Sequence, residues 1–344
     1  MQNEVFLRVE AAINAIKNGE MIIVMDDEDR ENEGDLVLAG IFSTPEKINF
    51  MAQEARGLVC VSITKEIATK LDLPPMVSQN SSNHETAFTV SIDAKAAKTG
   101  ISAYERDLTI NLMCKPNAKP EDFVRPGHIF PLIAKEGGVL ERTGHTEASI
   151  DICTLAGLKP VSVICEIMRE DGQMARRGDK FLTEFAQKHH LKILYVSDLI
   201  EYRLQFEQLI QKVGSTKSEF LGARVEKVQF QDHLGRIHTA FAFGNPKIPL
   251  VKFHIVKEDL ELFENQNAFN GLIYAVEKLK IEGGYLVFLK TRDSRDIKGL
   301  GIGAQILKAL EIKDFKLLSV SQVDESEYSA LSGFGLKILE RVEV

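Results

Sequence analysis

The stretch MIIVMDDEDRENEGDLVLAG, residues 21–40, decides how the N-terminal half of the chain is interpreted. Its first residues, MIIVMD, predict a short buried strand that runs into a polar loop, Asp26–Asp35, in which seven of ten residues are acidic. Carboxylates packed this closely repel each other unless they face solvent or hold a cation. A solvated loop is the simpler explanation of such a run. Because a polar loop that follows a buried strand is a common ligand site, however, the loop is a candidate metal site.

The sequence around this loop mixes helical and strand patterns. Helices are predicted at residues 5–18, 44–55 and 180–190 and strands at 57–64, 86–93 and 161–168, and the second half adds strands at 225–233, 238–244 and 285–290 and helices at 268–280 and 304–311. A chain of 344 residues exceeds the length at which one hydrophobic core usually stops growing. The expected fold class is therefore α+β, with two mixed α/β domains at 1–204 and 205–344 and a polar linker at 203–220.

The composition argues against several classes of protein. A formal charge of −8 without a basic block argues against a nucleic-acid surface, which needs clustered Lys and Arg. No apolar run approaches the roughly 20 residues that span a bilayer, and the N-terminus lacks a secretory pattern, so a cytoplasmic protein without membrane contact is expected. The four cysteines have no C-x-x-C spacing, which favours buried reduced thiols, and none follows Cys165.

A second cluster, residues 125–157, contains two histidines that each follow a glycine. His128 stands in Pro-Gly-His and His145 in Thr-Gly-His, and glycine turns let backbone and ligand approach closely. A lone histidine is more often structural than catalytic, so the presence of two favours a catalytic role only modestly. The residues around His145 supply a guanidinium, hydroxyl groups and backbone N–H groups, which would suit a phosphate. They are Arg142, Thr143, Gly144 and Thr146.

Glu166 lies inside the apolar run VSVICEIM, residues 161–168. A buried carboxylate is costly unless it is paired or functional, for example as an acid or base catalyst. An edge-strand residue that faces solvent explains the pattern equally well. Taken with the acidic loop and the histidines, Glu166 points to hard-cation chemistry on a phosphorylated substrate, because carboxylate and imidazole ligands suit Mg²⁺ or Mn²⁺.

Several ungapped segments resemble those of 3,4-dihydroxy-2-butanone 4-phosphate synthase, an enzyme family of riboflavin biosynthesis. They are DDEDRENEGDL, LVCVSIT, LDLPPMV, FTVSID, TGISAYERD, RPGHIFPL and GGVLERTGHTEASIDICTLAG, and they keep the family's order over about residues 5–200. The resemblance implies conversion of D-ribulose 5-phosphate to L-3,4-dihydroxy-2-butanone 4-phosphate, with C4 leaving as formate. It also implies a homodimer with its site near the subunit interface, and Mg²⁺ or Mn²⁺ as cofactor, two ions per site. Zinc is not expected, because no cysteine follows Cys165.

The resemblance assigns roles to particular residues. Glu31 and His145 are the expected metal ligands, and His128 and Glu166 are the expected catalytic residues. The substrate is expected to contact Arg30, Glu31, Asp35, Glu166, the loop Arg142–Thr146 and, in a further phosphate contact, Thr99. A divalent ion would act as Lewis acid toward an enediolate, while side chains of the site shuttle protons.

Residues from about 205 resemble a second family, GTP cyclohydrolase II, through VKFHIVKEDL, GIGAQILKALEIKDFKLLSV and GFGLKILERVEV. That family binds zinc through three cysteines. An ungapped alignment on His254 and Gly271 puts other residues at their positions, namely Lys257, Ala268 and Asn270.

Two further features of this half depart from the cyclohydrolase pattern. The segment 290–304 is short, and Arg292–Asp296 could stand for either of two arginine motifs. Catalytic zinc needs about three protein ligands, and no cysteine follows Cys165. The second domain is therefore expected to keep the fold without opening GTP.

Three hypotheses follow. The first is a lyase with a degenerate second domain, which could serve packing, assembly or the binding of a ligand or partner. The second is a bifunctional enzyme in which other ligands replace the thiolates, and the absent cysteines argue against it. The third is a non-enzymatic regulatory or binding protein, and the intact Glu31, His128, His145 and Glu166 argue against it.

Overall fold

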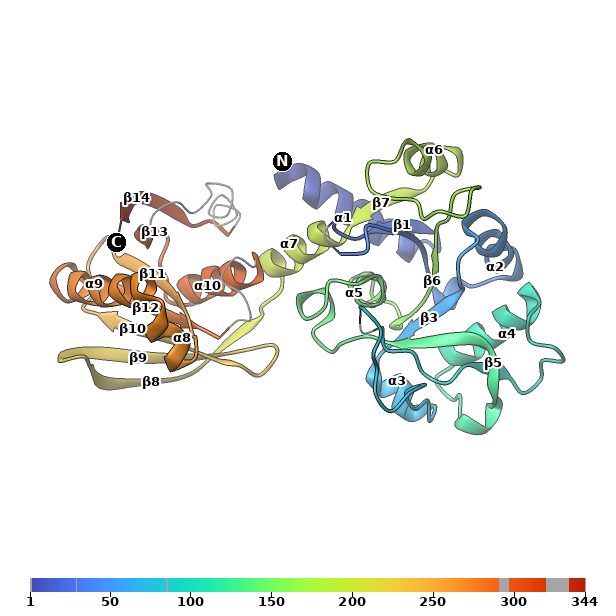
Figure 1. The fold of residues 1–344 in the computed structure, drawn as a ribbon, viewed down its shortest axis with the longest axis horizontal. Coiled ribbons are helices and arrows are strands. Elements are labelled where there is room, and N and C mark those ends of the chain that lie inside the picture. Colours follow the sequence, from blue (N-terminus) through green and yellow to red (C-terminus); the bar gives the residue numbers. More distant parts are fainter. Residues whose placement is uncertain (1, 29, 85, 291–296, 320–333, 344) are drawn as a thin grey trace. The chain divides into compact units, whose positions relative to one another are not determined.

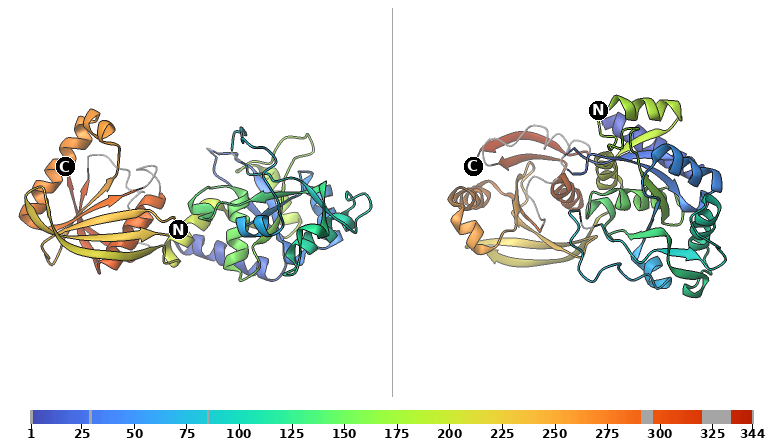
Figure 2. Two further views of the ribbon diagram at one scale, coloured as in Figure 1. Left: turned by 90° about the horizontal axis from the view of Figure 1, so that it is seen from below. Right: turned by 45° about the vertical axis from the view of Figure 1, so that its right-hand side comes forward.

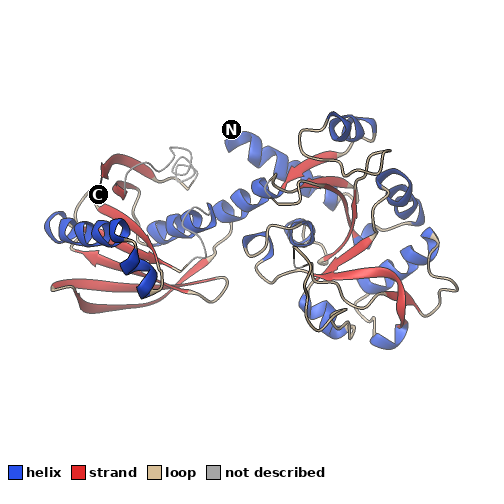
Figure 3. Ribbon diagram, viewed as in Figure 1, coloured by secondary structure: helices blue, strands red, loops and turns tan. Residues whose placement is uncertain are grey.

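The structure is a computed structural model that describes residues 2–28, 30–84, 86–290, 297–319 and 334–343. Its contacts divide the chain into two compact units, Met1–Tyr202 and Arg203–Val344, and each is described by itself. Figure 3 shows helices and strands in both units, which confirms the predicted α+β class with two mixed α/β domains. No helix in the described ranges is long and apolar enough to cross a bilayer.

After a hairpin of the first two strands, helices and strands alternate along the first unit (Figure 1). The helices are α1 (Gln2–Lys17), α2 (Pro45–Phe50), α3 (Lys65–Lys70), α4 (Ala103–Cys114), α5 (His145–Leu155), α6 (Lys180–Lys188) and α7 (Val196–Phe206). The strands are β1 (Ile22–Met25), β2 (Gly34–Ala39), β3 (Cys60–Ile63), β4 (Ile92–Ala94), β5 (Phe123–Ile133), β6 (Val161–Glu166) and β7 (Lys192–Tyr195). A π-helical turn, Met51–Ala55, extends α2, whose N-terminus is capped by Thr44.

These strands form one mixed sheet in the order β4-β5-β3-β6-β2-β1-β7. Strands β1, β2 and β3 are buried at every position, as expected for inner strands of a sheet covered on both faces. The antiparallel registers place Met25 of β1 opposite Gly34 of β2, and Asp35 of β2 opposite Glu166 of β6. The acidic loop and the carboxylate of Glu166 therefore lie at the same end of these neighbouring strands.

The structure confirms the predicted helices near 5–18, 44–55 and 180–190, but it corrects three other expectations. The strand predicted at 86–93 is reduced to Ile92–Ala94, with isolated bridges at Phe88 and Thr89. His128 lies in β5, which was not predicted because Pro and Gly interrupt its sequence. His145 lies on no turn; it is the first residue of α5.

The second unit also carries one mixed sheet, in the order β14-β13-β11-β12-β10-β9-β8, and Figure 2 gives two further views of it with its helices. Its strands are β8 (Ile210–Phe220), β9 (Ala223–Asp232), β10 (Ile237–Phe243), β11 (Leu250–Ile255), β12 (Gly284–Leu289), β13 (Asp314–Ser319) and β14 (Lys337–Glu343). Its helices are α8 (Asp259–Glu264), α9 (Gln266–Glu282) and α10 (Ile297–Ala309). Leu250, Leu286 and Leu279 share a core cluster, so α9 covers one face of the sheet.

The linker predicted at residues 203–220 is wrong. Residues 203–206 finish α7, and residues 210–220 form β8, which pairs with β9 along its length. Strand β8 is the edge of its sheet, and most of its side chains are exposed. An exposed polar edge strand has the composition of a linker, and for this reason the sequence pattern was misleading.

Candidate active site

The loop between β1 and β2 is folded around the carboxylate of Asp26, which is fully buried. Its Oδ1 accepts a hydrogen bond from the backbone N–H of Glu33 at 2.8 Å, and its Oδ2 accepts from the backbone N–H of Glu31 at 3.2 Å. The guanidinium of Arg30 donates to Asp26 Oδ2 at 2.7 Å and to both oxygens of Glu31 at 2.8 and 3.2 Å. These bonds offset the repulsion between the carboxylates, so the loop forms an ordered turn.

Three possible metal ligands converge beside this turn. Asp26, Glu31 and His145 each offer one ligand atom, and these atoms lie within 4.8 Å of one another. The Nδ1 of His145 lies 3.6 Å from Oε2 of Glu31, and its Nε2 lies 4.0 Å from Oδ1 of Asp26. The structure thus brings together the two expected metal ligands, Glu31 and His145. No second cluster of this kind occurs in the part of the chain that the structure describes.

Asp35 adds a buried carboxylate to the cluster. Its Oδ1 lies 3.9 Å from Nε2 of His145 and makes no hydrogen bond with any described residue. Burial raises the pKa of Asp35 to about 7; the charge of His145 opposes this shift and the charge of Glu166 adds to it. A buried oxygen without a partner costs free energy, which a cation or a substrate hydroxyl at this point would offset.

The charges of the cluster move the pKa values of Glu31 and His145 in opposite directions. Burial acts to lower the pKa of His145, but the charge of Asp35 and the hydrogen bond with Glu31 outweigh it and raise the pKa to about 9. Burial acts to raise the pKa of Glu31, but His145 and Arg30 outweigh it and lower the pKa to about 2. A divalent cation that binds both side chains must therefore displace the imidazole proton.

Glu166 is the last residue of β6, an inner strand of the sheet, so the alternative that placed it on an edge strand is wrong. The side chain is half-buried, and its Oε2 accepts a hydrogen bond from the backbone N–H of Leu58 at 2.9 Å. Gly57 permits this approach, because a Cβ there would lie 2.3 Å from the carbonyl oxygen of Glu166. The carboxylate is thereby held at the end of the strands where Asp35 and the acidic loop also lie.

The expected phosphate loop begins at Arg142, whose guanidinium is already engaged. Its Nη1 donates to Oε2 of Glu147 at 2.6 Å, and its Nη2 donates to the carbonyl of His84 at 2.9 Å. Gly144 precedes α5, and a Cβ there would lie 2.2 Å from Nη1 of Arg142. Arg142 thus orders the loop before α5, whose first backbone N–H groups favour an anion. Its direct contact with phosphate stays a prediction, as do those of Thr143 and Thr146.

Two other expected site residues, His128 and Thr99, make side-chain hydrogen bonds with acids outside the metal cluster. Within the described residues, no hydrogen bond or ion pair connects His128 to the metal cluster. Its Nδ1 lies 2.8 Å from Oδ2 of Asp93, and its side chain is 42% exposed. The hydroxyl of Thr99 donates to Oε2 of Glu105 at 2.9 Å, so the expected phosphate contact of Thr99 stays a prediction.

Sequence reasoning did not single out three acids of the site. Asp26 was one of seven acids, and nothing in the run marked it as the buried one. Glu147 stands in α5, which the sequence patterns did not predict, five residues after its partner Arg142. Asp93 lies 35 residues before His128, a separation that no local pattern bridges. The four cysteines are free and buried, as predicted.

In the second unit, the residues aligned with the zinc cysteines cannot replace them. Lys257 forms an ion pair with Glu261, and a lysine cation repels a metal ion. Ala268 has no ligand atom, and its backbone N–H donates to the capping side chain of Asn265. Asn270 is exposed on α9. The arginine-containing segment Arg292–Asp296 lies outside the described residues.

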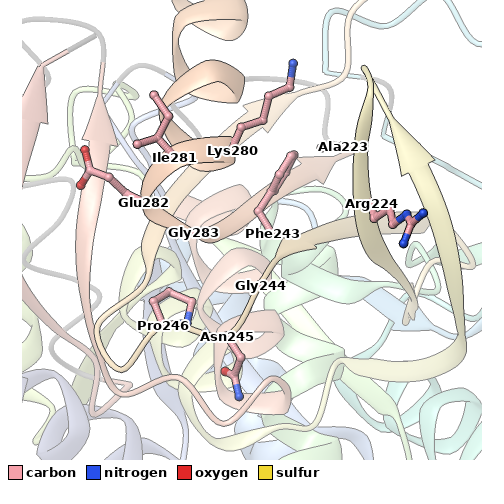
Figure 4. A pocket seen from close by; sticks show the side chains of 10 residues that line it. All are labelled: Ala223, Arg224, Phe243, Gly244, Asn245, Pro246, Lys280, Ile281, Glu282 and Gly283. Atoms are coloured by element: carbon pink, nitrogen blue, oxygen red, sulfur yellow. The ribbon is translucent and has the colours of Figure 1, made fainter.

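A shallow pocket of about 470 Å³ lies in the second unit, near the residues that precede β11 and β12. Figure 4 shows its side chains: Arg224 comes from β9, Lys280 and Glu282 come from the end of α9, and the three do not point toward one common centre. None of the positions aligned with the zinc cysteines lines it. The pocket is therefore distinct from the degenerate zinc site.

Comparisons with known proteins agree with this division of the chain. The family model for 3,4-dihydroxy-2-butanone 4-phosphate synthase matches residues 10–202, and the model for GTP cyclohydrolase II matches only residues 289–343. A 3,4-dihydroxy-2-butanone 4-phosphate synthase from Helicobacter hepaticus is 64% identical and covers 98% of this chain and 99% of its own.

Two solved structures are also similar to this chain. RibBX, a two-domain 3,4-dihydroxy-2-butanone 4-phosphate synthase from A. baumannii, is 40% identical, with a TM-score of 0.83, and the match covers 97% of this chain and 99% of RibBX. A 3,4-dihydroxy-2-butanone 4-phosphate synthase in complex with two magnesium ions is 42% identical, with a TM-score of 0.54, over 58% of this chain and 97% of that one. This chain therefore belongs to the 3,4-dihydroxy-2-butanone 4-phosphate synthase family.

Proposed function

We propose that this chain converts D-ribulose 5-phosphate to L-3,4-dihydroxy-2-butanone 4-phosphate and formate in riboflavin biosynthesis. The main support for this proposal is that Asp26, Glu31 and His145 lie close together. They do so at the end of the strands where Asp35 and Glu166 also lie. Carboxylates and an imidazole in this arrangement suit a hard divalent ion and an oxygen-rich substrate.

The donor set fits magnesium. The chemistry of Glu31 and His145 suits Mg²⁺ or Mn²⁺, and the unpartnered Oδ1 of Asp35 marks a further oxygen that a cation or its ligands would satisfy. A related synthase has been solved with two magnesium ions, and we propose the same number for this site. When bound, the metal supplies Lewis acidity that stabilises the negative charge of an enediolate.

The side chains of the site would divide the remaining tasks. Glu166, held by Leu58 at one oxygen, would move a proton to or from the substrate carbon next to the carbonyl. Asp35 can hydrogen-bond a sugar hydroxyl through its unpartnered oxygen. The ordered loop from Arg142 to Thr146 would anchor the phosphate, so that binding energy remote from the chemistry positions the reacting carbons.

A direct assay tests the metal requirement of this function. Full-length protein is incubated with ribulose 5-phosphate and Mg²⁺, and formate is measured with a coupled dehydrogenase. Formate release is expected with Mg²⁺, loss of release after EDTA, and recovery when excess Mg²⁺ is added. Turnover that EDTA leaves unchanged would contradict the metal assignment, and no turnover under any condition would contradict the function.

The affinity for Mg²⁺ is expected to rise with pH. The raised pKa of His145, about 9, means that the metal-free protein holds a proton there at neutral pH, and metal binding must release it. Affinity should therefore increase by about tenfold per pH unit up to about pH 9 and then level off. Isothermal titration calorimetry at pH 7, 8 and 9 measures this, and an affinity independent of pH would show that His145 is no ligand.

We further propose a homodimer formed through the outer face of α4. Tyr104 and Leu108 are one helical turn apart on α4, and Ile101 lies just before the helix; they are 72%, 41% and 56% exposed, which is unusual for three large apolar residues so close together. Gly100, next to Ile101, packs against His128, so a partner on this face would lie near that side chain. The family resemblance implies a homodimer with its site near the subunit interface, which is compatible with this face.

Sedimentation analysis of a double variant tests the dimer. Tyr104→Glu with Leu108→Glu places two charges on the apolar face of α4 and is expected to give a folded monomer. Tyr274→Glu with Ile281→Glu, on exposed apolar positions of α9, is the matched control and is expected to keep the wild-type mass. A monomeric wild-type protein, or dissociation by the control variant alone, would contradict this interface.

The second unit is expected to have no GTP cyclohydrolase II activity. Lys257, Ala268 and Asn270 supply neither thiolates nor a substitute ligand set, and the family model covers only a fragment of this unit. Incubation with GTP, Mg²⁺ and Zn²⁺ should release no formate above background, while the same preparation turns over ribulose 5-phosphate. Clear GTP turnover would refute this expectation.

A further inference from the structure

A bulge in the sheet presents His128 to solvent. Ile92 of β4 pairs with Ile129 of β5, but the next residue, Asp93, pairs with Val124, so residues 125–128 leave the ladder. Bulges of this kind redirect a side chain and are frequent beside active sites. Gly127 makes this bulge possible, because a Cβ there would lie 2.0 Å from the carbonyl carbon of Ile92.

Asp93 holds His128 at two points. Oδ1 of Asp93 accepts a hydrogen bond from the backbone N–H of His128 at 2.9 Å, and Oδ2 lies 2.8 Å from the imidazole Nδ1. A carboxylate only accepts hydrogen bonds, so Nδ1 carries a hydrogen, and in the neutral ring Nε2 then keeps its lone pair. The Asp93 side chain is 9% exposed and that of His128 is 42% exposed, and Nε2 makes no hydrogen bond to any described residue.

The loop before α4 closes over this pair. Gly100 has a φ of +86°, and a Cβ there would lie 2.0 Å from Oδ2 of Asp93 and 2.5 Å from Nδ1 of His128. The carboxylate of Glu105 holds the loop in place by accepting from the backbone N–H groups of residues 98, 99 and 100 at 2.6, 3.2 and 3.0 Å. The hydrogen bond between Asp93 and His128 is therefore covered on one side by backbone that only glycine can supply.

We propose that Asp93 is the positioning residue of His128, an inference that rests on the proposed function and on the catalytic role that the family resemblance implies for that histidine. Asp93 fixes the Nδ1–H tautomer and points the Nε2 lone pair outward. A substrate proton can then move to Nε2 while its electron pair stays on the substrate, and the carboxylate of Asp93 stabilises the resulting imidazolium. Asp93 touches no substrate and acts only through His128.

The proposal is tested by Asp93→Asn with two readouts. An asparagine amide can donate to Nδ1 and so shift the proton to Nε2, which leaves no acceptor on the exposed side of the ring. The value of kcat is expected to fall by about 10²–10⁴-fold, while KM stays within about threefold. Asp122→Asn is the matched control, because Asp122 caps a turn through Lys119 just before β5 without contacting His128. It should keep wild-type kinetics.

Nitrogen-15 NMR of histidine-labelled protein reads the tautomer without reference to activity. The His128 signals are assigned by their loss in His128→Gln, and the wild-type protein should show a protonated Nδ1 and an unprotonated Nε2. Wild-type protein with the opposite tautomer would overturn the proposal even if Asp93→Asn failed to fold. Normal kcat in a folded Asp93→Asn would overturn it as well. Absence of wild-type turnover would instead refute the proposed function, and the NMR result would still decide the tautomer.

Discussion

Replacing Glu31 by glutamine is expected to lower turnover of ribulose 5-phosphate by about a thousandfold or more. Glu31 meets His145 at 3.6 Å and Asp26 within the same ligand cluster, and its lowered pKa, about 2, keeps it ionised at any pH where the enzyme works. A neutral amide removes one anionic ligand and leaves the charge of Arg30 less balanced. Mg²⁺ affinity should fall together with kcat.

The fold should tolerate this change. Glu31 lies on a loop, and the backbone hydrogen bonds that order the turn go to Asp26, while the Glu31 side chain accepts from Arg30, as a glutamine carbonyl still can. The melting temperature of Glu31→Gln should therefore stay close to that of the wild type. Glu28→Gln, an exposed acid of the same loop, is the matched control and should keep full activity. Equal loss of activity in both variants would mean that the loop acts through its total charge and that Glu31 has no special role.

Replacing Glu166 by glutamine is expected to reduce kcat by about 10²–10⁴-fold. Its carboxylate is held by the backbone N–H of Leu58, and a glutamine carbonyl can accept the same hydrogen bond, so the strand end should keep its position. What is lost is the group that exchanges a proton with the substrate. KM and Mg²⁺ affinity should change little, which separates this variant from Glu31→Gln.

Glu170→Gln serves as the control for this second substitution. Glu170 follows β6 by four residues, its side chain is 88% exposed, and it lies outside the cluster. It should behave as the wild type in steady-state kinetics and in melting. If Glu166→Gln kept more than about a tenth of wild-type kcat, proton transfer would have to be assigned to another residue.

The sequence predicted those parts of the fold that local patterns determine. The helix at 44–55 starts with Thr44 and Pro45, and the structure has the Thr44 cap and a helix beginning at Pro45. The buried strand before the acidic loop was predicted from its apolar run. By contrast, β5 contains Pro126, Gly127 and Pro131. These residues have low strand propensity, so β5 is not predicted from the sequence.

The pairing of distant residues is the part of the site that the sequence could not supply. His145 reaches the acidic loop across more than a hundred positions, and Glu166 faces Asp35 only because β2 and β6 are neighbours. Propensity and periodicity act over a few residues and contain no information about strand order. The resemblance to a known family marked the functional residues, namely Glu31, His128, His145 and Glu166. The structure adds three acids that hold parts of the site in place: Asp26 orders the acidic loop, Asp93 contacts His128, and Glu147 contacts Arg142.

The fate of a single carbon atom tests the central claim most directly. Ribulose 5-phosphate labelled with carbon-13 at C4 is incubated with full-length protein and Mg²⁺ and followed by NMR. The proposed reaction predicts that the label appears as formate, that the four-carbon phosphate forms without label, and that EDTA stops both until Mg²⁺ is restored. Label that remains in a sugar phosphate, or formate that forms equally well in EDTA, would contradict the account.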